Sequence, residues 1–310
     1  MNLNGKIVTV FGGSGFLGTY VVRELAESGY TVKIVCRNPD NSKALKTAGY
    51  VGQIVPVKGN ITDYDKLPEL VRGSYAVVNL VGILYESGKQ KFDKLHAEAP
   101  GKLAEAAKIS GVEKFVHVSA IIDAESKSLY AKSKLQGEKN IAAAFPDAYI
   151  VKPSVIFGPE DNFFNMFAAM SSFSPFLPLI GGGKTKMQPV YVGDVALAIR
   201  KMITEETKPG AYQLGGPEAL TFREILGRVV EYTDRKRFLL NLPFGLAKLA
   251  AVPAPKAILT GDQVELLKHD NVVTSRTKTL TELNIVPTAI EAVVPKYLAR
   301  FKQRKPAYVN

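Results

Sequence analysis

Tyr130 and Lys134 are the residues of this sequence whose types and spacing could carry proton chemistry. Positions i and i+4 of a helix share one face, so the two side chains are expected to be neighbours. An ammonium beside a phenol favours the phenolate, which would let Tyr130 act as an acid or base near neutral pH. Ser119 follows an apolar run at 114–118 and could donate a hydrogen bond to a substrate oxygen. These three residues form the predicted catalytic set.

A glycine-rich segment lies between a strand predicted at 6–11 and a helix predicted at 16–28. Its glycines have the spacing GxxGxxG. Small residues there let the backbone approach a pyrophosphate, whose charge is stabilised by the helix N-terminus. The segment therefore predicts a dinucleotide site. The residues assigned to it are Gly12, Ser14, Gly15, Phe16, Leu17 and Gly18.

Arg37 follows the second apolar run, where NAD-binding proteins usually carry an acidic residue for the ribose 2′-hydroxyl. A basic side chain suits a 2′-phosphate, with a charge-assisted hydrogen bond of about 1.5–3 kcal/mol. The predicted cofactor is therefore NADPH in preference to NADH. Asn60 and Ile61 follow the third run, where the adenine is expected, and Asp63 lies close by. A plain turn is the alternative interpretation of Asn60 and Asp63.

The elements that must position these residues alternate between short apolar runs and helix-period segments. Such alternation predicts an α/β fold, a Rossmann-type doubly wound parallel sheet with helices on both faces. The predicted strands are 6–11, 31–36, 54–57, 75–81, 114–118 and 149–152, and the helices between them are 16–28, 41–48, 64–72, 92–109 and 130–144.

The pattern changes after Gly158, which predicts a second, smaller mixed domain. We expect residues 1–158 to form the NADP(H)-binding domain, with 187–203 returning to it, and 159–310 to form the smaller C-terminal domain. A capping box formed by Thr221 and Glu224 predicts a helix through 232. Residues 238–259 are apolar but interrupted by prolines. Two interpretations of this segment stay open: part of the hydrophobic core, or a surface that lies on a membrane or another subunit.

Composition excludes several classes of protein. The 310 residues are 46% hydrophobic and 22% charged, which is ordinary for a globular protein, and no apolar run of about 18 residues suggests a membrane span. Cys36 is the single cysteine, so no internal disulfide can form and a reducing compartment is expected. No secretory signal is recognised. The three histidines lack metal-ligand spacing, so no metal is predicted.

The net charge of +11 is concentrated at the C-terminal end. No acidic residue follows Glu291, so these last residues form a basic tail. Its contact with anionic lipid is predicted, with an acidic partner or a solvated tail as alternatives, and no nucleic-acid binding is expected. Its basic residues are Lys296, Arg300, Lys302, Arg304 and Lys305.

From Gly12 to about residue 226 the chain resembles the extended short-chain dehydrogenases/reductases. The motifs that carry this resemblance are the glycine segment, Ser119 with Tyr130 and Lys134, and residues 152–159, 188–195 and 214–217. A narrower resemblance is to the nucleotide-binding accessory subunit of respiratory complex I, NADH:ubiquinone oxidoreductase. It rests on residues 78–88, 157–165, 179–183 and 262–268.

The narrower resemblance implies a dehydrogenase fold that holds NADPH without independent turnover. Tyr130 and Lys134 would then hold the cofactor. Further cofactor contacts are implied at Leu80, Val81, Gly82, Pro153 and Val155. The implied partners are peripheral-arm subunits of complex I near the quinone site, with the protein peripheral on the cytoplasmic face of the inner membrane in a bacterial form.

Two other functions remain open. One is an NAD(P)-dependent reductase, epimerase or dehydratase that uses Ser119, Tyr130 and Lys134. The other is a redox sensor whose partner affinity follows the state of its nicotinamide. One departure from the catalytic relatives is that the chain has Leu95-His96-Ala97-Glu98 where they often have an asparagine opening the helix after the fourth strand.

Overall fold

The computed structural model of the chain describes residues 4–256 and 258–302. The chain forms two units. The first comprises Met1–Pro153, Val192–Leu214 and Val273–Val286, and the second Ser154–Tyr191, Gly215–Val272 and Pro287–Asn310.

The boundaries differ from the predicted ones at 158, 187 and 203. The first unit ends at Pro153 because β7 (Ile156–Phe157) pairs with β10 (Val190–Tyr191) in a small sheet of the second unit. Residues 187–191 therefore do not return to the nucleotide-binding sheet. The first unit also gains β11 (Gly210–Leu214) and the segment Val273–Val286, which is joined to it by a hydrogen bond from the Gln213 amide to the Lys278 carbonyl (2.8 Å).

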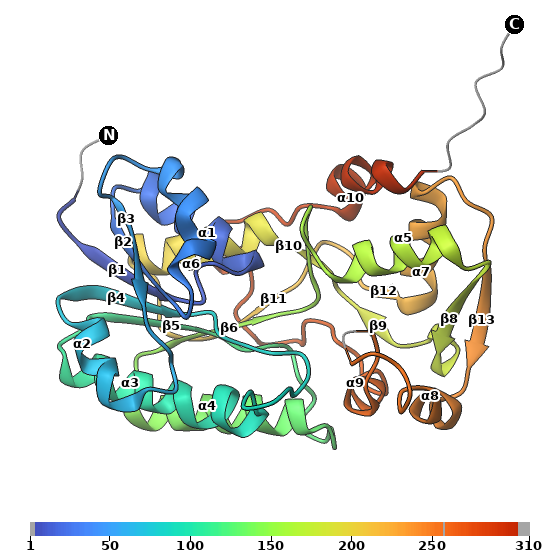
Figure 1. Cartoon of the computed structure of the whole chain (residues 1–310), viewed down its shortest axis with the longest axis horizontal. Coiled ribbons are helices and arrows are strands. Elements are labelled where there is room, and N and C mark those ends of the chain that lie inside the picture. The colour runs from blue at the N-terminus through green and yellow to red at the C-terminus, as the bar shows by residue number, and fades with distance from the viewer. Residues whose placement is uncertain (1–3, 257, 303–310) are drawn as a thin grey trace, which may run out of the picture. The chain divides into compact units, whose positions relative to one another are not determined.

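A seven-stranded parallel sheet forms the centre of the first unit (Figure 1). Its order, β11-β6-β5-β4-β1-β2-β3, has a topological switch point between β1 and β4, which confirms the predicted doubly wound α/β fold. The strands are β1 (Ile7–Phe11), β2 (Thr31–Cys36), β3 (Ile54–Lys58), β4 (Ser74–Asn79), β5 (Lys114–Val118), β6 (Tyr149–Pro153) and β11.

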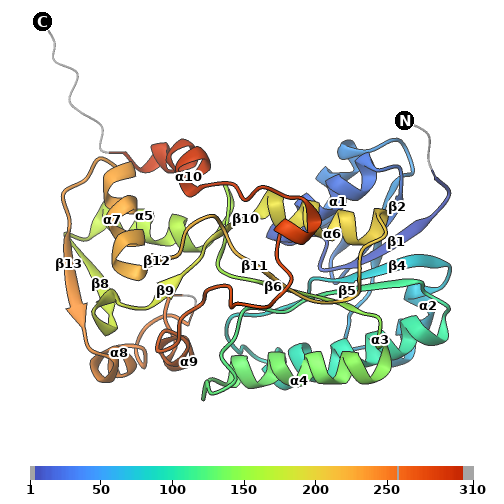
Figure 2. The same ribbon diagram turned by 180° about the vertical axis from the view of Figure 1, so that it is seen from behind.

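Helices cover both faces of this sheet (Figures 1 and 2). One face carries α1 (Phe16–Glu27) and α6 (Val192–Thr204). The other carries α2 (Leu67–Val71), α3 (Ala99–Ile109) and α4 (Leu129–Ala144). Three predicted helices differ in kind: Pro39–Ala48 is 3₁₀, 64–72 begins with a 3₁₀ turn at Tyr64–Lys66, and 92–109 begins with a π-helical turn at Asp93–Glu98.

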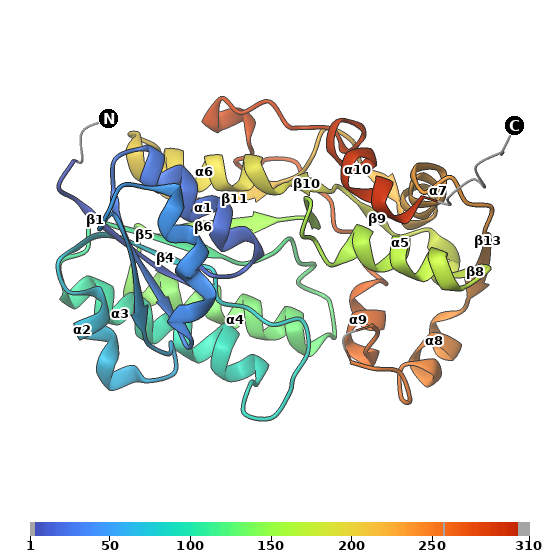
Figure 3. The same ribbon diagram turned by 45° about the horizontal axis from the view of Figure 1, so that its top comes forward.

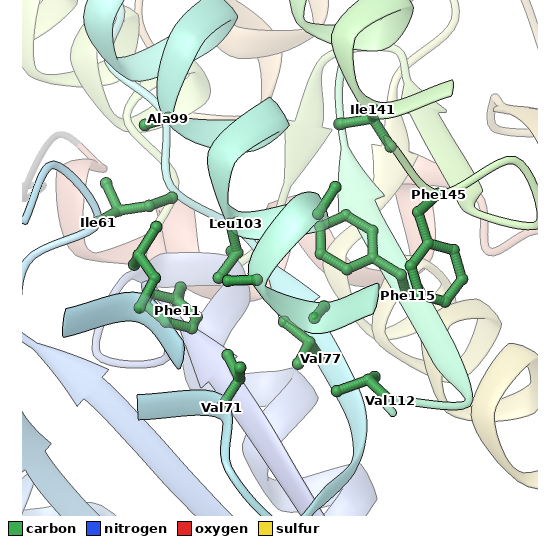
Figure 4. Packing of buried hydrophobic residues seen from close by; sticks show 14 of the residues in the cluster. Phe11, Ile61, Val71, Val77, Ala99, Leu103, Val112, Phe115, Ile141 and Phe145 are labelled. Atoms are coloured by element: carbon green, nitrogen blue, oxygen red, sulfur yellow. The ribbon is translucent and has the colours of Figure 1, made fainter. Parts of the chain in front are cut away.

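The hydrophobic core beneath the second face joins β1, β4 and β5 to α3 and α4 (Figure 4). Phe115 of β5 is fully buried and its ring packs against Phe145, with ring centroids 5.6 Å apart. Truncating a buried phenylalanine to alanine typically costs about 3–5 kcal/mol. The core therefore fixes the strand ends at which the predicted site residues lie.

The second unit is built from three two-stranded sheets and short helices (Figure 3). Helices α5, α7 and α10 pack together. Thr221 caps α7 and forms the predicted capping box with Glu224. The elements are α5 (Phe163–Phe173), β8 (Phe176–Ile180), β9 (Lys186–Met187), β12 (Leu220–Thr221), α7 (Phe222–Tyr232), β13 (Phe238–Leu242), α8 (Phe244–Ala250), α9 (Gly261–Leu266) and α10 (Ile290–Leu298), with β7 and β10.

The parallel pair β8–β13 has one buried and one exposed face. Leu177 and Leu179 point into the core of the second unit. Phe176 faces Phe238 in register, and both are exposed, as is Leu240. We call Phe176, Phe238 and Leu240 the exposed sheet face.

The basic tail lies partly within the described residues. Lys296 is in α10, and the Arg300 guanidinium donates to the Asn165 side-chain oxygen (2.6 Å). Arg304 and Lys305 lie outside the described residues. Among the helices that the structure describes, none combines the length and the hydropathy needed to cross a bilayer.

Candidate functional site

The glycine segment connects β1 to α1, and its glycines serve different purposes. Gly12 has a φ of +81°, and a Cβ there would lie 3.1 Å from the Leu80 carbonyl carbon. A Cβ at Gly18 would overlap the Gly12 carbonyl oxygen. Gly15 is exposed, and its Cβ would meet only that same oxygen, at 3.3 Å. Gly12 and Gly18 are thus required by the fold, whereas Gly15 leaves open space that a ligand can use.

Helix α1 begins immediately after this segment, with Phe16 and Leu17 in its first turn. Gly15 is the N-cap and has no side chain to accept from the first amides, and no acidic residue lies in the first turn. Such amides carry partial positive charge and need an acceptor. Ser14 is half-buried beside them. The arrangement fits the pyrophosphate of a dinucleotide.

The residues predicted around the adenosine ribose follow β2 and β3. Arg37 is exposed directly after β2. Asn60 accepts from the Thr62 amide through its side chain (3.3 Å) and from the Asp63 amide through its carbonyl (3.0 Å), which is the turn chemistry of the alternative interpretation. Ile61 is buried in the core. Adenosine contacts of Arg37, Asn60 and Ile61 stay predictions.

Residues 80–83 follow β4 and lie close to the Lys134 side chain; we call them the β4 loop. The Leu80 amide donates to the Phe11 carbonyl (2.9 Å), and the Val81 amide to the Asn79 side chain (3.1 Å). A Cβ at Gly82 would lie 3.5 Å from Lys134 Nζ. The structure thus brings the predicted residues 80–82 together with Lys134.

Tyr130 and Lys134 lie on one face of α4, as their spacing predicts. Lys134 Nζ donates to the Val118 carbonyl (3.1 Å) and lies 6.0 Å from the centre of the Tyr130 ring. Burial lowers the pKa of Lys134 to about 8, although the Glu138 carboxylate opposes this.

The expected phenolate at neutral pH is wrong for the chain as it stands. Burial raises the pKa of Tyr130 to about 12, so its phenol is protonated. The reason is that desolvation in the buried site disfavours the anionic phenolate.

Ser119 is 4% exposed and faces α4. Its hydroxyl donates to Glu138 Oε1 (2.6 Å), and Glu138 Oε2 accepts from Lys152 (3.0 Å). A hydroxyl has a single proton to donate, so in this arrangement Ser119 does not donate to a substrate. Sequence reasoning missed Glu138 and Lys152. The signal was present, because Glu138 stands one helical turn after Lys134.

Two histidines lie near Lys134, and sequence reasoning gave neither of them a role in the site. His117 is buried, its Nδ1 accepts from the Asn79 amide (3.1 Å), and its Nε2 is buried without a hydrogen-bond partner in the described part of the chain. Burial and the Lys134 charge hold its pKa well below the usual value. His96 is also buried. Across residues 4–256 and 258–302, no three His, Cys, Asp or Glu side chains gather to hold a metal.

The two residues predicted against the nicotinamide fall in different units. Pro153 ends β6 and pairs with Leu214 in the large sheet. Val155 is in the second unit, where its carbonyl accepts from the Val190 amide (2.9 Å). Their cofactor contacts stay predictions.

Comparison with known proteins defines the class. The model of the NAD dependent epimerase/dehydratase family matches residues 8–215, and the chain belongs to this family. It is an NAD(P)-binding short-chain dehydrogenase/reductase of the extended type. It is also a homologue of a complex I subunit.

The complex I relatives match nearly the whole chain. It is 31% identical to the mitochondrial NADH dehydrogenase (ubiquinone) 1 alpha subcomplex subunit 9 of Arabidopsis thaliana, over 99% of this chain and 81% of the relative. It is 32% identical to the NADH-ubiquinone oxidoreductase 40 kDa subunit of Neurospora crassa (97% and 81%) and 33% identical to the Mus musculus subunit 9 (97% and 82%).

Solved structures share the fold. An NADPH-dependent quinone oxidoreductase of Escherichia coli in complex with NADPH superposes with a TM-score of 0.76 at 19% identity, covering 94% of this chain and 99% of that one. A Citrobacter triphenylmethane reductase complexed with NADP(H) gives 0.75 at 20% identity, covering 95% and 99%. At these identities the likeness shows the fold alone.

Proposed function

We propose that this chain is an NADPH-holding accessory subunit of respiratory complex I, without turnover of its own. It would bind peripheral-arm subunits near the quinone site, on the cytoplasmic face of a bacterial inner membrane. The observation that carries the proposal is the 31–33% identity to complex I subunits over 97–99% of the chain. That similarity extends through the second unit, which lies largely outside the region matched by the family model.

The site chemistry supports a holding role rather than turnover. Ser119 gives its proton to Glu138, and the Tyr130 phenol has a pKa of about 12. Carbonyl reduction needs a donor aimed at the substrate oxygen and an acid whose pKa lies near the working pH. Binding needs neither. NADPH held at concentrations far above its dissociation constant would instead add several kcal/mol to folding stability, roughly 3–4 at 100 to 1,000 times that constant.

The exposed sheet face supports a protein partner. Monomeric proteins seldom expose large contiguous apolar patches. The rings of Phe176 and Phe238 lie with their centroids 5.9 Å apart and are 50% and 72% exposed, and Leu240 of the same face is 55% exposed. A complex I subunit would cover such side chains.

Copurification from gently solubilised membranes tests the assembly. The tagged chain, expressed from its own locus, should be recovered with the iron–sulfur subunits of complex I and with NADH:quinone oxidoreductase activity. A strain that carries the untagged chain is the control. Recovery of the chain as a free protein, with complex I intact without it, would refute the proposal.

The alternative is a working NAD(P)-dependent reductase, epimerase or dehydratase, favoured by the intact Tyr130 and Lys134. Tyr130→Phe separates the two functions because it removes only the phenolic oxygen. An enzyme should lose roughly 10²- to 10⁴-fold in turnover. An accessory subunit should lose at most about tenfold in NADPH affinity and keep quinone-coupled NADH oxidation unchanged.

That assay is run on membranes beside a deletion strain. If Tyr130→Phe abolished activity as fully as the deletion while the complex still assembled, chemistry at Tyr130 would be required. A sensor role would show differently, as partner affinity that changes between NADPH and NADP⁺.

A further inference from the structure

His96 connects the β4 loop to α4 through both nitrogens of its ring. Nε2 accepts a hydrogen bond from the Ile83 amide (3.0 Å). A nitrogen that accepts carries no proton, so the proton is on Nδ1 and is donated to Ser133 Oγ (3.1 Å). Ser133 in turn donates to the Tyr130 carbonyl (2.8 Å). Three hydrogen bonds thus link the loop to the helix turn that carries Tyr130 and Lys134.

The surroundings of His96 leave the ring one orientation. It is fully buried, stacked on Phe92 with centroids 5.3 Å apart, and met edge-on by Tyr130 at 5.2 Å. The π-helical turn Asp93–Glu98 carries it, and a Cβ at Gly137 of α4 would overlap its carbonyl oxygen. Its backbone and ring are therefore both held by α4.

His96 stays an acceptor at every physiological pH. Burial and the nearby Lys134 charge lower its pKa to about 2. The charged and titratable groups that face it are Lys134, Tyr130 and His117; burial raises the pKa of Tyr130, which keeps that phenol neutral, and the pKa of His117 is itself held low. A neutral imidazole can accept from a backbone amide, whereas an imidazolium cannot.

We propose that His96 is the positioning residue that holds residues 80–83 in the conformation that binds the nicotinamide half of the dinucleotide. The inference rests on the proposed NADPH binding. In a doubly wound sheet the second mononucleotide half begins at β4, so this loop serves the nicotinamide side while the glycine segment serves the pyrophosphate. A Cβ built at Gly82 would lie 3.7 Å from His96 Nε2, and Gly82 itself is exposed. The imidazole ring therefore supports the β4 loop from its buried side, directly below Gly82.

Two substitutions separate the hydrogen bonds from the bulk of the ring. His96→Leu fills the space but leaves the Ile83 amide without an acceptor. His96→Gln offers an amide oxygen to Ile83 and an amide N–H to Ser133. Phe115→Leu is the matched control, since Phe115 is equally buried in the same unit and its ring packs against Phe145 of another element rather than against His96.

Dissociation constants are measured by fluorescence titration for NADPH and by competition for 2′,5′-ADP, which lacks the nicotinamide half. We expect His96→Leu to raise the dissociation constant of NADPH roughly 10- to 100-fold and that of 2′,5′-ADP less than about threefold. His96→Gln should bind NADPH within about threefold of the wild type. Phe115→Leu should lower the urea midpoint without changing either constant.

Several outcomes overturn the inference. One is a folded His96→Leu variant that binds NADPH with wild-type affinity. Another is a variant that loses affinity equally for NADPH and 2′,5′-ADP. The third is a His96→Gln variant that binds NADPH as weakly as His96→Leu does. If His96→Leu does not fold, His96→Gln and Ser133→Ala decide the question. We expect Ser133→Ala to lower the affinity for NADPH about three- to tenfold and to leave that for 2′,5′-ADP unchanged. A wild-type chain that binds neither probe would remove the proposed cofactor and this inference together, whereas NADPH binding with an unaffected Leu variant would remove the inference alone.

Discussion

The two units of the chain bury their side chains in different ways. In the first, seven parallel strands are covered on both faces, and the buried polar groups Asn79, His96 and Lys134 have named partners. In the second, three two-stranded sheets leave Phe176, Phe238 and Leu240 exposed on one side. The first unit gathers buried polar side chains around a candidate binding site, where His117 Nε2 is a buried nitrogen that has no hydrogen-bond partner among the described residues. In the second unit Phe176 and Phe238 lie together on an exposed sheet face that we expect a partner to cover, so we assign ligand binding to the first unit and assembly to the second.

Gly15→Val should give the largest effect, because it fills the space left open for a pyrophosphate, whereas its Cβ would lie 3.3 Å from the Gly12 carbonyl oxygen, a contact that a small shift can relieve. We expect NADPH affinity to fall at least about 100-fold with the unfolding midpoint little changed. Gly18→Val is the matched contrast, and it should lower stability because its Cβ overlaps the Gly12 carbonyl. Unchanged NADPH binding by folded Gly15→Val would show that the loop binds something else.

Arg37→Glu should weaken the binding of NADPH roughly 10- to 100-fold and that of NADH far less, because a carboxylate would face the 2′-phosphate. Titration of both cofactors against purified protein measures the ratio. Equal losses for the two would remove Arg37 from the phosphate site. Arg223→Glu, in the second unit, is the control of equal charge change.

Lys134→Met should stabilise the chain without cofactor while weakening NADPH binding. The folded state lowers the pKa of Lys134 from 10.5 to about 8, so below pH 8 the buried ammonium costs about 3 kcal/mol of stability. The cost is relieved as pH rises from 8 to 10.5, where the unfolded chain binds the proton and the folded chain does not. After loss of the bond to the Val118 carbonyl, we expect a gain of about 1–2 kcal/mol at pH 7.

Urea unfolding at pH 7 and 9.5 measures this difference between the wild type and Lys134→Met. The advantage of the variant should shrink at the higher pH. An advantage that stayed constant, or a loss of stability at both values, would mean that the ammonium is solvated in the folded chain.

Leu240→Ser tests the second unit, with the smallest expected effect on folding. Leu240 is 55% exposed, so its removal should change the free energy of unfolding by less than about 0.5 kcal/mol. It should nevertheless reduce copurification with complex I. Leu177→Ala, on the buried face of the same sheet, should cost about 2–5 kcal/mol. A large stability loss in Leu240→Ser, with assembly intact, would assign the exposed sheet face to folding.

The first unit could be predicted from sequence almost element by element, because its signals are local. Apolar runs of strand length alternate with helix-period segments, and the six predicted strands correspond to β1 through β6. Strand β11 was missed although it is as long as β6, since its sequence GAYQL, with a glycine and a glutamine, is not a continuous apolar run. The unit boundary was placed too late because two-residue strands such as β7 have no periodicity to detect.

The candidate site was predictable as a set of positions but not as a set of partners. The shared face of Tyr130 and Lys134 follows from helix geometry alone. The pairing of Ser119 with Glu138, and of His96 with Ile83, depends on how β4, β5 and α4 meet, which spacing along the chain does not encode. The direction of the Tyr130 pKa was mispredicted because burial, rather than the neighbouring charge, is its cause.

The chain passes between the two units five times, at 153/154, 191/192, 214/215, 272/273 and 286/287. Synthesis proceeds from the N-terminus, and domains generally fold as units when their residues have emerged. The first unit cannot be complete until Val286 has left the ribosome, by which time most of the second has also been made. Nascent β6 therefore waits with an open edge until β11 arrives, and a product truncated at the end of the first segment would present that edge to other chains. On this order of events, the nucleotide-binding half is among the last parts of the molecule to close.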